Sequence, residues 1–220
     1  MLPIVRGCAF KLQLSLSEFS AAMSTIPITV ALLVPMLLAA AAPGRAAGNT
    51  TPDAVVTAFY QARIASGTRG APSADELALL APYLGPELHC LLAAAARFRD
   101  RHSAHAPDDK PPFAEGDLYS SVFEGPTRFV LERHELAATR AVIQVRFFYD
   151  DRGVADRVGW VDTIHLARHA DRWLIEDIEY QLGCDFCSRG RLADNLRSEL
   201  APTLDSPRWA GMADTGCVSP

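Results

Sequence analysis

The spacing of apolar residues changes its period along this chain, and that change restricts the fold more than any other feature. Between residues 52 and 102 apolar side chains recur at the spacing of helices that are buried on one side. From residue 127 to 181 they alternate with polar side chains, as in half-buried strands. Because helices come first and strands then follow one another, the order predicts an α+β domain. Its N-terminal helices would pack on one face of a curved antiparallel sheet of about four strands.

Capping and turn residues place the boundaries of these elements. Thr51, Pro52 and Asp53 are typical of a helix start, and Gly67 is typical of a helix end. Ser73 followed by Glu76 is a capping box that predicts a second helix. The longest helix is expected over residues 87–102, the strands over 127–135, 140–149, 157–168 and 172–181, and a last helix over about 191–200.

The first 47 residues have the pattern of a secretory signal peptide. Residues 26–42 carry no charge and are mostly apolar, and the small residues Ala46 and Ala47 follow them. Met23 is a candidate for the true start, because the basic residues lie far upstream of the apolar run. The alternative is an uncleaved anchor in the inner membrane, which the two prolines of the run disfavour. We therefore expect a signal peptide over residues 1–47, a periplasmic or secreted domain over 48–202, and an irregular tail over 203–220.

The charge of the chain argues against one class of partner. The formal net charge is −5, and loss of residues 1–47, with three basic residues and one acidic residue, makes it −7. A mildly acidic domain lacks the basic surface with which proteins bind nucleic acid. The sequence contains no phosphate-binding glycine loop, nucleophile elbow or zinc-enzyme motif. We expect no cofactor, no metal and no nucleic-acid partner, and membrane contact only through the signal segment.

Four cysteines follow the signal segment: Cys90, Cys184, Cys187 and Cys217. They allow three pairings, which sequence alone does not rank. Cys184 and Cys187 form a candidate disulfide, and a redox pair, a metal site and inert thiols are the alternatives. The motif lacks the flanking residues typical of thioredoxin-like proteins, and a metal site would need two more ligands. A structural disulfide that involves one or both of these cysteines is therefore favoured.

Three segments resemble a family of uncharacterised exported bacterial proteins within the nuclear transport factor 2-like superfamily. They are residues 80–91, LAPYLGPELHCL, residues 115–125, EGDLYSSVFEG, and residues 173–196, WLIEDIEYQLGCDFCSRGRLADNL. The resemblance covers about residues 50–200, and the second and third segments are the more specific. It implies an exported protein with a cone-like fold, in which helices cover a bent sheet, and it implies no catalytic residues. The family lacks the two cysteines of CDFC, so any role of that pair would be particular to this chain.

The last two strands bring two aspartates together if they form a hairpin. With His169 and Ala170 as the turn, Asp177 lies opposite Asp162, and a shift of two residues would instead oppose Glu179 to Asp162. In either register one face carries Trp160, Asp162, Ile164, Trp173, Ile175, Asp177 and Glu179. Opposed carboxylates in apolar surroundings need a proton, a cation or a ligand. They are either an acid pair at the mouth of a pocket or structural carboxylates, exposed at a strand end or neutralised by Arg128, Arg146 or Arg152.

The loop over residues 113–126 supplies the remaining candidates. Its apolar side chains are expected to fold onto the open end of the cone, where they either plug a pocket or form its rim. The candidate pocket therefore comprises Asp162, Asp177, Trp160, Trp173, Phe113, Tyr119 and Phe123.

These features favour a binding or interaction domain over an enzyme. The expected partner is a small apolar or amphipathic molecule, or a protein, bound at the open end of the cone. One alternative is an isomerase- or dehydratase-like enzyme that uses Asp162 and Asp177, and the other is an envelope or immunity-type interaction module. The outer face of the sheet is expected to be apolar enough for a homodimer, through Val161, Leu174, Ile178 and Tyr180.

Overall fold

The computed structural model describes residues 51–150, 158–184, 187–205 and Cys217. The chain divides into two units, Met1–Ala42 and Pro43–Pro220, and every described residue belongs to the second. The expected signal peptide lies outside the described residues, and so does most of the expected tail. Within the described part, no helix combines the length and the apolar character that a membrane crossing requires.

The helices begin close to the residues that the sequence marks, and α3 runs to His105, beyond its expected end at residue 102. They are α1 (Pro52–Ser66), α2 (Ala74–Leu80), α3 (Pro86–His105) and α4 (Leu192–Asp205), with a short 3-10 helix η1 (Ala81–Tyr83) after α2. The Thr51 and Ser73 hydroxyls accept hydrogen bonds from the backbone of α1 and α2, and Gly67 ends α1 in the left-handed conformation. The last helix extends to Asp205, beyond its expected end near residue 200.

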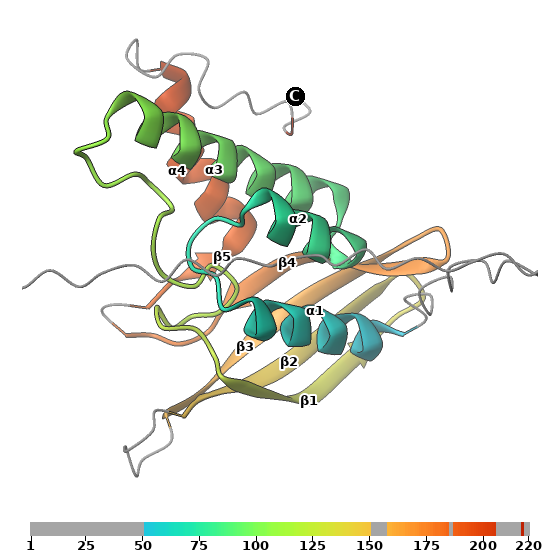
Figure 1. Cartoon of the computed structure of the whole chain (residues 1–220). Helices are drawn as coiled ribbons and strands as arrows, with labels where there is room; N and C mark the ends of the chain where they lie inside the picture. Colours follow the sequence, from blue (N-terminus) through green and yellow to red (C-terminus); the bar gives the residue numbers. More distant parts are fainter. Residues whose placement is uncertain (1–50, 151–157, 185–186, 206–216, 218–220) are drawn as a thin grey trace, which may run out of the picture. The chain divides into compact units, whose positions relative to one another are not determined.

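The strands form one open antiparallel sheet in sequence order, as Figure 1 shows. They are β1 (Arg128–Leu136), β2 (Arg140–Tyr149), β3 (Val158–His169), β4 (Arg172–Tyr180) and the two-residue β5 (Gly190–Arg191). The α+β class is confirmed, and the sheet has five strands because β5 pairs with the end of β4. Such a short strand carries too few residues to show an alternating pattern in the sequence.

The core lies between the helices and one face of the sheet. Helix α1 contacts β1, β2 and β4, while α3 packs against α4 and both of these contact β4. Aromatic rings fill the space between α1 and the sheet: the ring centroids of Tyr60 and Phe147 lie 4.8 Å apart, and those of Phe147 and Trp160 lie 5.7 Å apart.

The register of the last hairpin differs from the prediction, and the two aspartates do not face each other. The turn residues are Ala170 and Asp171, so that His169 pairs with Arg172. A β-bulge then follows in β4, because Leu166 pairs with Ile175 whereas the next residue, His165, pairs with Asp177. The extra residue reverses the direction of every later side chain in β4.

The same bulge overturns the expectation that Ile178 and Tyr180 lie on the outer face of the sheet. Ile178 is fully buried, and both residues belong to the hydrophobic core. Ile175, which precedes the bulge, lies in the same core. Odd-numbered Ile175 and even-numbered Ile178 and Tyr180 therefore all point to the inner face of the sheet. The outer face that was expected to support a homodimer is therefore less apolar than its sequence suggests.

Four cysteines form two pairs. Cys184, of the candidate pair, bonds to Cys187, and Cys90 of α3 bonds to Cys217. The Cα atoms of the two pairs lie 5.1 and 5.4 Å apart. Disulfides of this kind are typical of proteins in oxidising, extracytoplasmic compartments.

Candidate functional site

The carboxylate of Asp162 has a structural role, because hydrogen bonds from the rest of the fold engage it. It is fully buried on β3, and its carboxylate accepts hydrogen bonds from the Ser121 amide at 2.7 Å, the Gln181 amide at 3.0 Å and the Trp160 indole at 3.2 Å. The Ser121 hydroxyl donates a fourth hydrogen bond. Burial raises the pKa of Asp162, and the hydrogen bonds from Ser121, Gln181 and Trp160 oppose that rise. Asp162 thus fastens the loop that holds Ser121 to the sheet.

Asp177 caps a helix. Its Oδ1 accepts a hydrogen bond from the Ala193 amide at 3.0 Å, in the first turn of α4. The guanidinium of Arg191 lies 3.7 Å from Oδ2. A carboxylate at this place satisfies a free amide and complements the positive end of the helix.

The other predicted pocket residues are dispersed. Trp160 and Tyr119 belong to the core, whereas Phe113, Trp173 and Asp177 line three different hollows. In the loop over residues 113–126, Tyr119 is fully buried and plugs the interior, while Phe123 remains 49% exposed. The predicted set therefore does not form one pocket.

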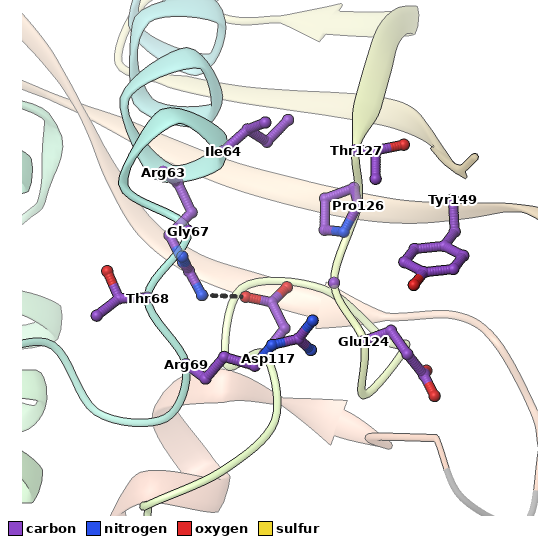
Figure 2. Close-up of a pocket in the computed structure, with 11 residues that line it drawn as sticks. Arg63, Ile64, Gly67, Thr68, Arg69, Asp117, Glu124, Pro126, Thr127 and Tyr149 are labelled. Atoms are coloured by element: carbon purple, nitrogen blue, oxygen red, sulfur yellow. Dashed lines mark hydrogen bonds and ion pairs between the residues drawn. The ribbon is translucent and has the colours of Figure 1, made fainter. Parts of the chain in front are cut away.

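A different site lies at the C-terminal end of α1. We call it the Asp117 pocket, a hollow of about 320 Å³ between the end of α1, the loop that contains Asp117, and the end of β2. Its polar lining comes from Arg63, Thr68, Arg69, Asp117, Glu124, Thr127 and Tyr149. Figure 2 shows Asp117 in the middle of these residues, joined to Arg63.

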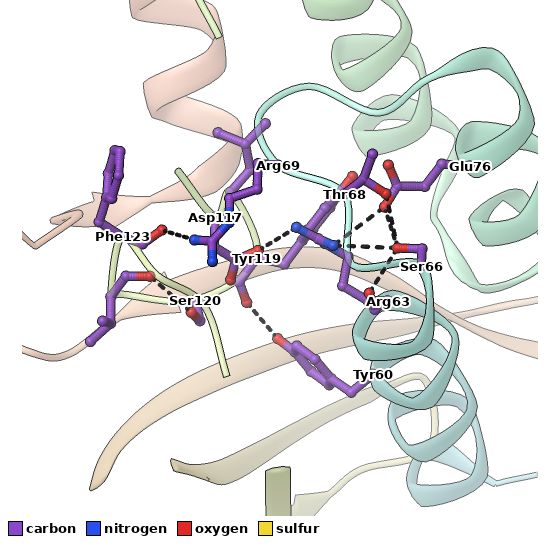
Figure 3. A network of polar contacts seen from close by, with 12 residues as sticks. Tyr60, Arg63, Ser66, Thr68, Arg69, Glu76, Asp117, Tyr119, Ser120 and Phe123 are labelled. Atoms are coloured by element: carbon purple, nitrogen blue, oxygen red, sulfur yellow. Dashed lines mark hydrogen bonds and ion pairs between the residues drawn. The ribbon is translucent and has the colours of Figure 1, made fainter. Parts of the chain in front are cut away.

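A buried ion cluster contributes Arg63 and Asp117 to the wall of the Asp117 pocket. Arg63 Nη2 donates a hydrogen bond to Asp117 Oδ1 at 3.0 Å, and Arg63 Nη1 lies 3.5 Å from Glu76 Oε1. Ser66 supports the cluster by donating to Glu76 Oε1 at 2.9 Å (Figure 3). The side chains of Arg63, Glu76 and Asp117 are only 7%, 4% and 3% exposed. One guanidinium is thus buried against two carboxylates.

Three polar atoms in and beside this cluster are buried without a hydrogen-bond partner. They are Arg63 Nε, Asp117 Oδ2 and Tyr119 Oη. The guanidinium of Arg63 lies over the Tyr119 ring, 5.1 Å from its centroid, which places these two residues in contact. Buried polar groups in proteins almost always have a partner, so three such atoms together indicate that a water, an ion or a ligand completes the site.

Burial sets the protonation of this cluster. It raises the pKa of Asp117, and the charge of Arg63, the neighbouring Ser120 hydroxyl and Tyr119 amide, and the hydrogen bond from Arg63 oppose the rise. Burial also raises the pKa values of Tyr60 and Tyr119, so both phenols keep their protons. Tyr60 uses its hydroxyl to donate to the Tyr119 carbonyl at 2.8 Å.

Sequence reasoning missed this site because its members are far apart in the chain. Arg63 and Asp117 are separated by 54 residues. One signal was present: Arg63 follows Val56, Phe59 and Tyr60 at helical spacing, on the buried face of α1. An arginine at such a position needs a buried carboxylate, and this need could have prompted a search for Asp117.

Neither a metal-binding cluster nor a known relative identifies the function of this site. Within the described residues, no group of three histidine, cysteine, aspartate or glutamate side chains is placed to hold a metal ion. Comparisons with protein-family models, with curated proteins and with solved structures find no match.

Proposed function

We propose that this protein is an exported, non-enzymatic domain of the nuclear transport factor 2-like type, which binds a small polar molecule in the Asp117 pocket. The observation that carries the proposal is the set of buried atoms without partners, Arg63 Nε and Asp117 Oδ2 above all, in the wall of a hollow of about 320 Å³. A volume of that size suits a small molecule. A ligand that supplied the missing hydrogen bonds would recover the free energy lost by burying these groups.

The polarity of the pocket changes the expected ligand. The sequence favours an apolar or amphipathic molecule, whereas charged and hydroxyl side chains make up much of the lining here. The enzyme alternative also loses its carboxylate pair, because Asp162 and Asp177 are not paired across the hairpin. Each of them instead makes hydrogen bonds that hold the fold.

Export is supported by two observations. The sequence of residues 1–47 has the pattern of a signal peptide, and the cysteines pair as they do in oxidising compartments. Cell fractionation of the full chain, with N-terminal sequencing of the product, tests this part of the proposal. We expect a periplasmic or secreted product that begins near residue 48, and a cytoplasmic product of full length would contradict it.

Binding is tested by asking what the protein retains when it is purified from its own cells. Native mass spectrometry of the wild type should show a bound small molecule. Asp117→Asn should retain much less of it, and Asp171→Asn is the matched control, because the Asp171 side chain is fully exposed at the β3–β4 turn. Absence of a ligand from the wild type, or equal retention by Asp117→Asn, would overturn the proposed function.

A protein-interaction role is the second candidate, and the edge strand β1 favours it. Val130 and Leu136 of β1 are 49% and 69% exposed, and β1 lies at the edge of the sheet. Exposed apolar residues on an edge strand are a ready surface for pairing with another chain. Sedimentation of the wild type and of Val130→Lys tests for a homodimer, which would be present only in the wild type.

A further inference from the structure

The buried cluster holds more negative than positive charge. Arg63 is the only cation of the trio that it forms with Glu76 and Asp117, so one carboxylate charge is left over. At the exposed rim of the Asp117 pocket, Arg69 and Glu124 carry opposite charges and cancel each other formally. The charged residues that line the pocket balance, and Glu76, which contacts Arg63 outside the lining, gives the cluster and rim together a formal excess of one negative charge. Uncompensated charge is costly where water is excluded, so the site favours a positive guest.

The buried atoms without a partner include one acceptor, Asp117 Oδ2, and one donor, Arg63 Nε. Asp117 Oδ1 is used by Arg63, whereas Oδ2 is buried and has no donor. Gly125 lies beside it, with φ of +70°, and a Cβ atom at that position would be 3.4 Å from Oδ2. Because glycine carries no side chain, residue 125 supplies no donor to Oδ2. A ligand with an N–H or O–H group can donate to it.

The remaining walls suit an alkyl group. Ile64, Pro126 and the ring of Tyr149 line the Asp117 pocket beside the charged residues, as Figure 2 shows. Apolar side chains of this kind bind short hydrocarbon segments through burial of apolar surface. A carboxylate ligand would add to the negative excess, and a neutral alcohol would supply a donor without balancing the charge.

We propose that the Asp117 pocket selects a small organic cation with a primary ammonium group, whose N–H donates to Asp117 Oδ2 and whose alkyl part lies against Ile64, Pro126 and Tyr149. This inference rests on the proposed function, since it names the class of ligand that the same pocket takes. The ammonium supplies the missing donor and the missing positive charge at once, which neither an alcohol nor a carboxylate does.

The test uses three probes of equal length: butylamine, butan-1-ol and butyrate. Each is titrated into the full mature domain at neutral pH while the backbone amides are followed by NMR. Butylamine should shift the Gly125 and Thr127 amides to saturation, and the other two probes should not. Asp117→Asn should weaken butylamine at least about tenfold, since a buried charged hydrogen bond is lost, while Asp171→Asn should bind like the wild type.

Glu124→Gln keeps the test decisive if Asp117→Asn fails to fold, because Glu124 is exposed at the rim. Loss of its charge should weaken butylamine by about twofold to fivefold, as for a solvent-exposed ion pair. No saturable shift with butylamine, or stronger binding of butyrate or butan-1-ol at the same amides, would overturn the cation proposal. The proposed function would survive that result if the wild type still retained another molecule in native mass spectrometry and Asp117→Asn retained less of it. It would fail if the wild type retained no molecule or if both retained it equally.

Discussion

At the residue scale, the buried carboxylates of Asp162 and Asp117 differ in the number of hydrogen-bond donors that they receive. Asp162 receives four hydrogen-bond donors and has no capacity left for a ligand. Asp117 shares one oxygen with Arg63 and leaves the other without a donor. Both residues are buried and both pKa values are raised, so burial alone does not separate a structural acid from a candidate binding acid. The number of donors separates them.

Asp162→Ala should therefore destabilise the domain severely. The substitution leaves the Ser121 and Gln181 amides and the Trp160 indole without their acceptor, and we expect a loss of about 3 kcal/mol or more in the free energy of unfolding. Urea denaturation measures it, with Asp171→Ala as the exposed control. A loss below about 1 kcal/mol would show that Asp162 is not a structural anchor.

The pH dependence of stability should reveal Asp117. Its pKa is raised by burial above the ordinary value of 3.8, so the folded state holds this proton to higher pH than the unfolded state does. The stability of the wild type then falls as pH rises from about 3.8 through the folded pKa. Asp117→Asn lacks this fall, so its stability relative to the wild type should increase with pH across that range. Urea denaturation at several pH values measures the difference, and a constant or decreasing difference would contradict the raised pKa.

At the element scale, α4 depends on a cap supplied by a strand. Asp177 of β4 accepts from the Ala193 amide, and Leu192, Leu196 and Leu200 bury the inner side of the helix. Asp177→Ala should cost about 1–2 kcal/mol, the usual value of a helix cap. Hydrogen exchange should speed up first in α4. Asp177→Asn, whose amide oxygen can still accept, should keep most of the protection, and equal losses in the two variants would contradict the capping role.

The loop before α2 depends on a glycine. Gly70 has φ of +71°, and a Cβ atom there would lie 2.1 Å from the Phe113 carbonyl oxygen. Gly67 has φ of +62° with no atom within 4 Å of such a Cβ, which makes it a matched control. We expect Gly70→Ala to cost about 3 kcal/mol or more, from clash and backbone strain, and Gly67→Ala about 1 kcal/mol from backbone strain alone. Thermal unfolding distinguishes them, and equal costs would rule out the close approach.

At the scale of the whole molecule, the two disulfides close loops of very different length. Cys90 and Cys217 are 127 positions apart, whereas Cys184 and Cys187 are separated by 3. If chain entropy dominates, the long loop contributes about 5 kcal/mol and the short one about 2 kcal/mol. Cys90→Ser with Cys217→Ser should therefore lower the free energy of unfolding more than the other double substitution. Denaturation of both variants under non-reducing conditions measures this, and the reverse order would contradict the entropic account.

The sequence by itself determined the features that depend on local contacts. Caps at Thr51 and Ser73, the helix end at Gly67 and the alternation of β2 can all be predicted because each depends on residues a few positions apart. The α+β class follows from the same kind of local information.

Only the tertiary structure decided the pairing of distant residues. The bulge in β4 turns Asp177 away from Asp162, and a single extra residue in a strand leaves little trace in an apolar pattern. The Asp117 pocket needs Arg63 from α1, Glu76 from α2 and Asp117 from a later loop, which meet only when the helices pack on the sheet. Sequence spacing carries no measure of such contacts, because their energies depend on burial and geometry in the folded chain.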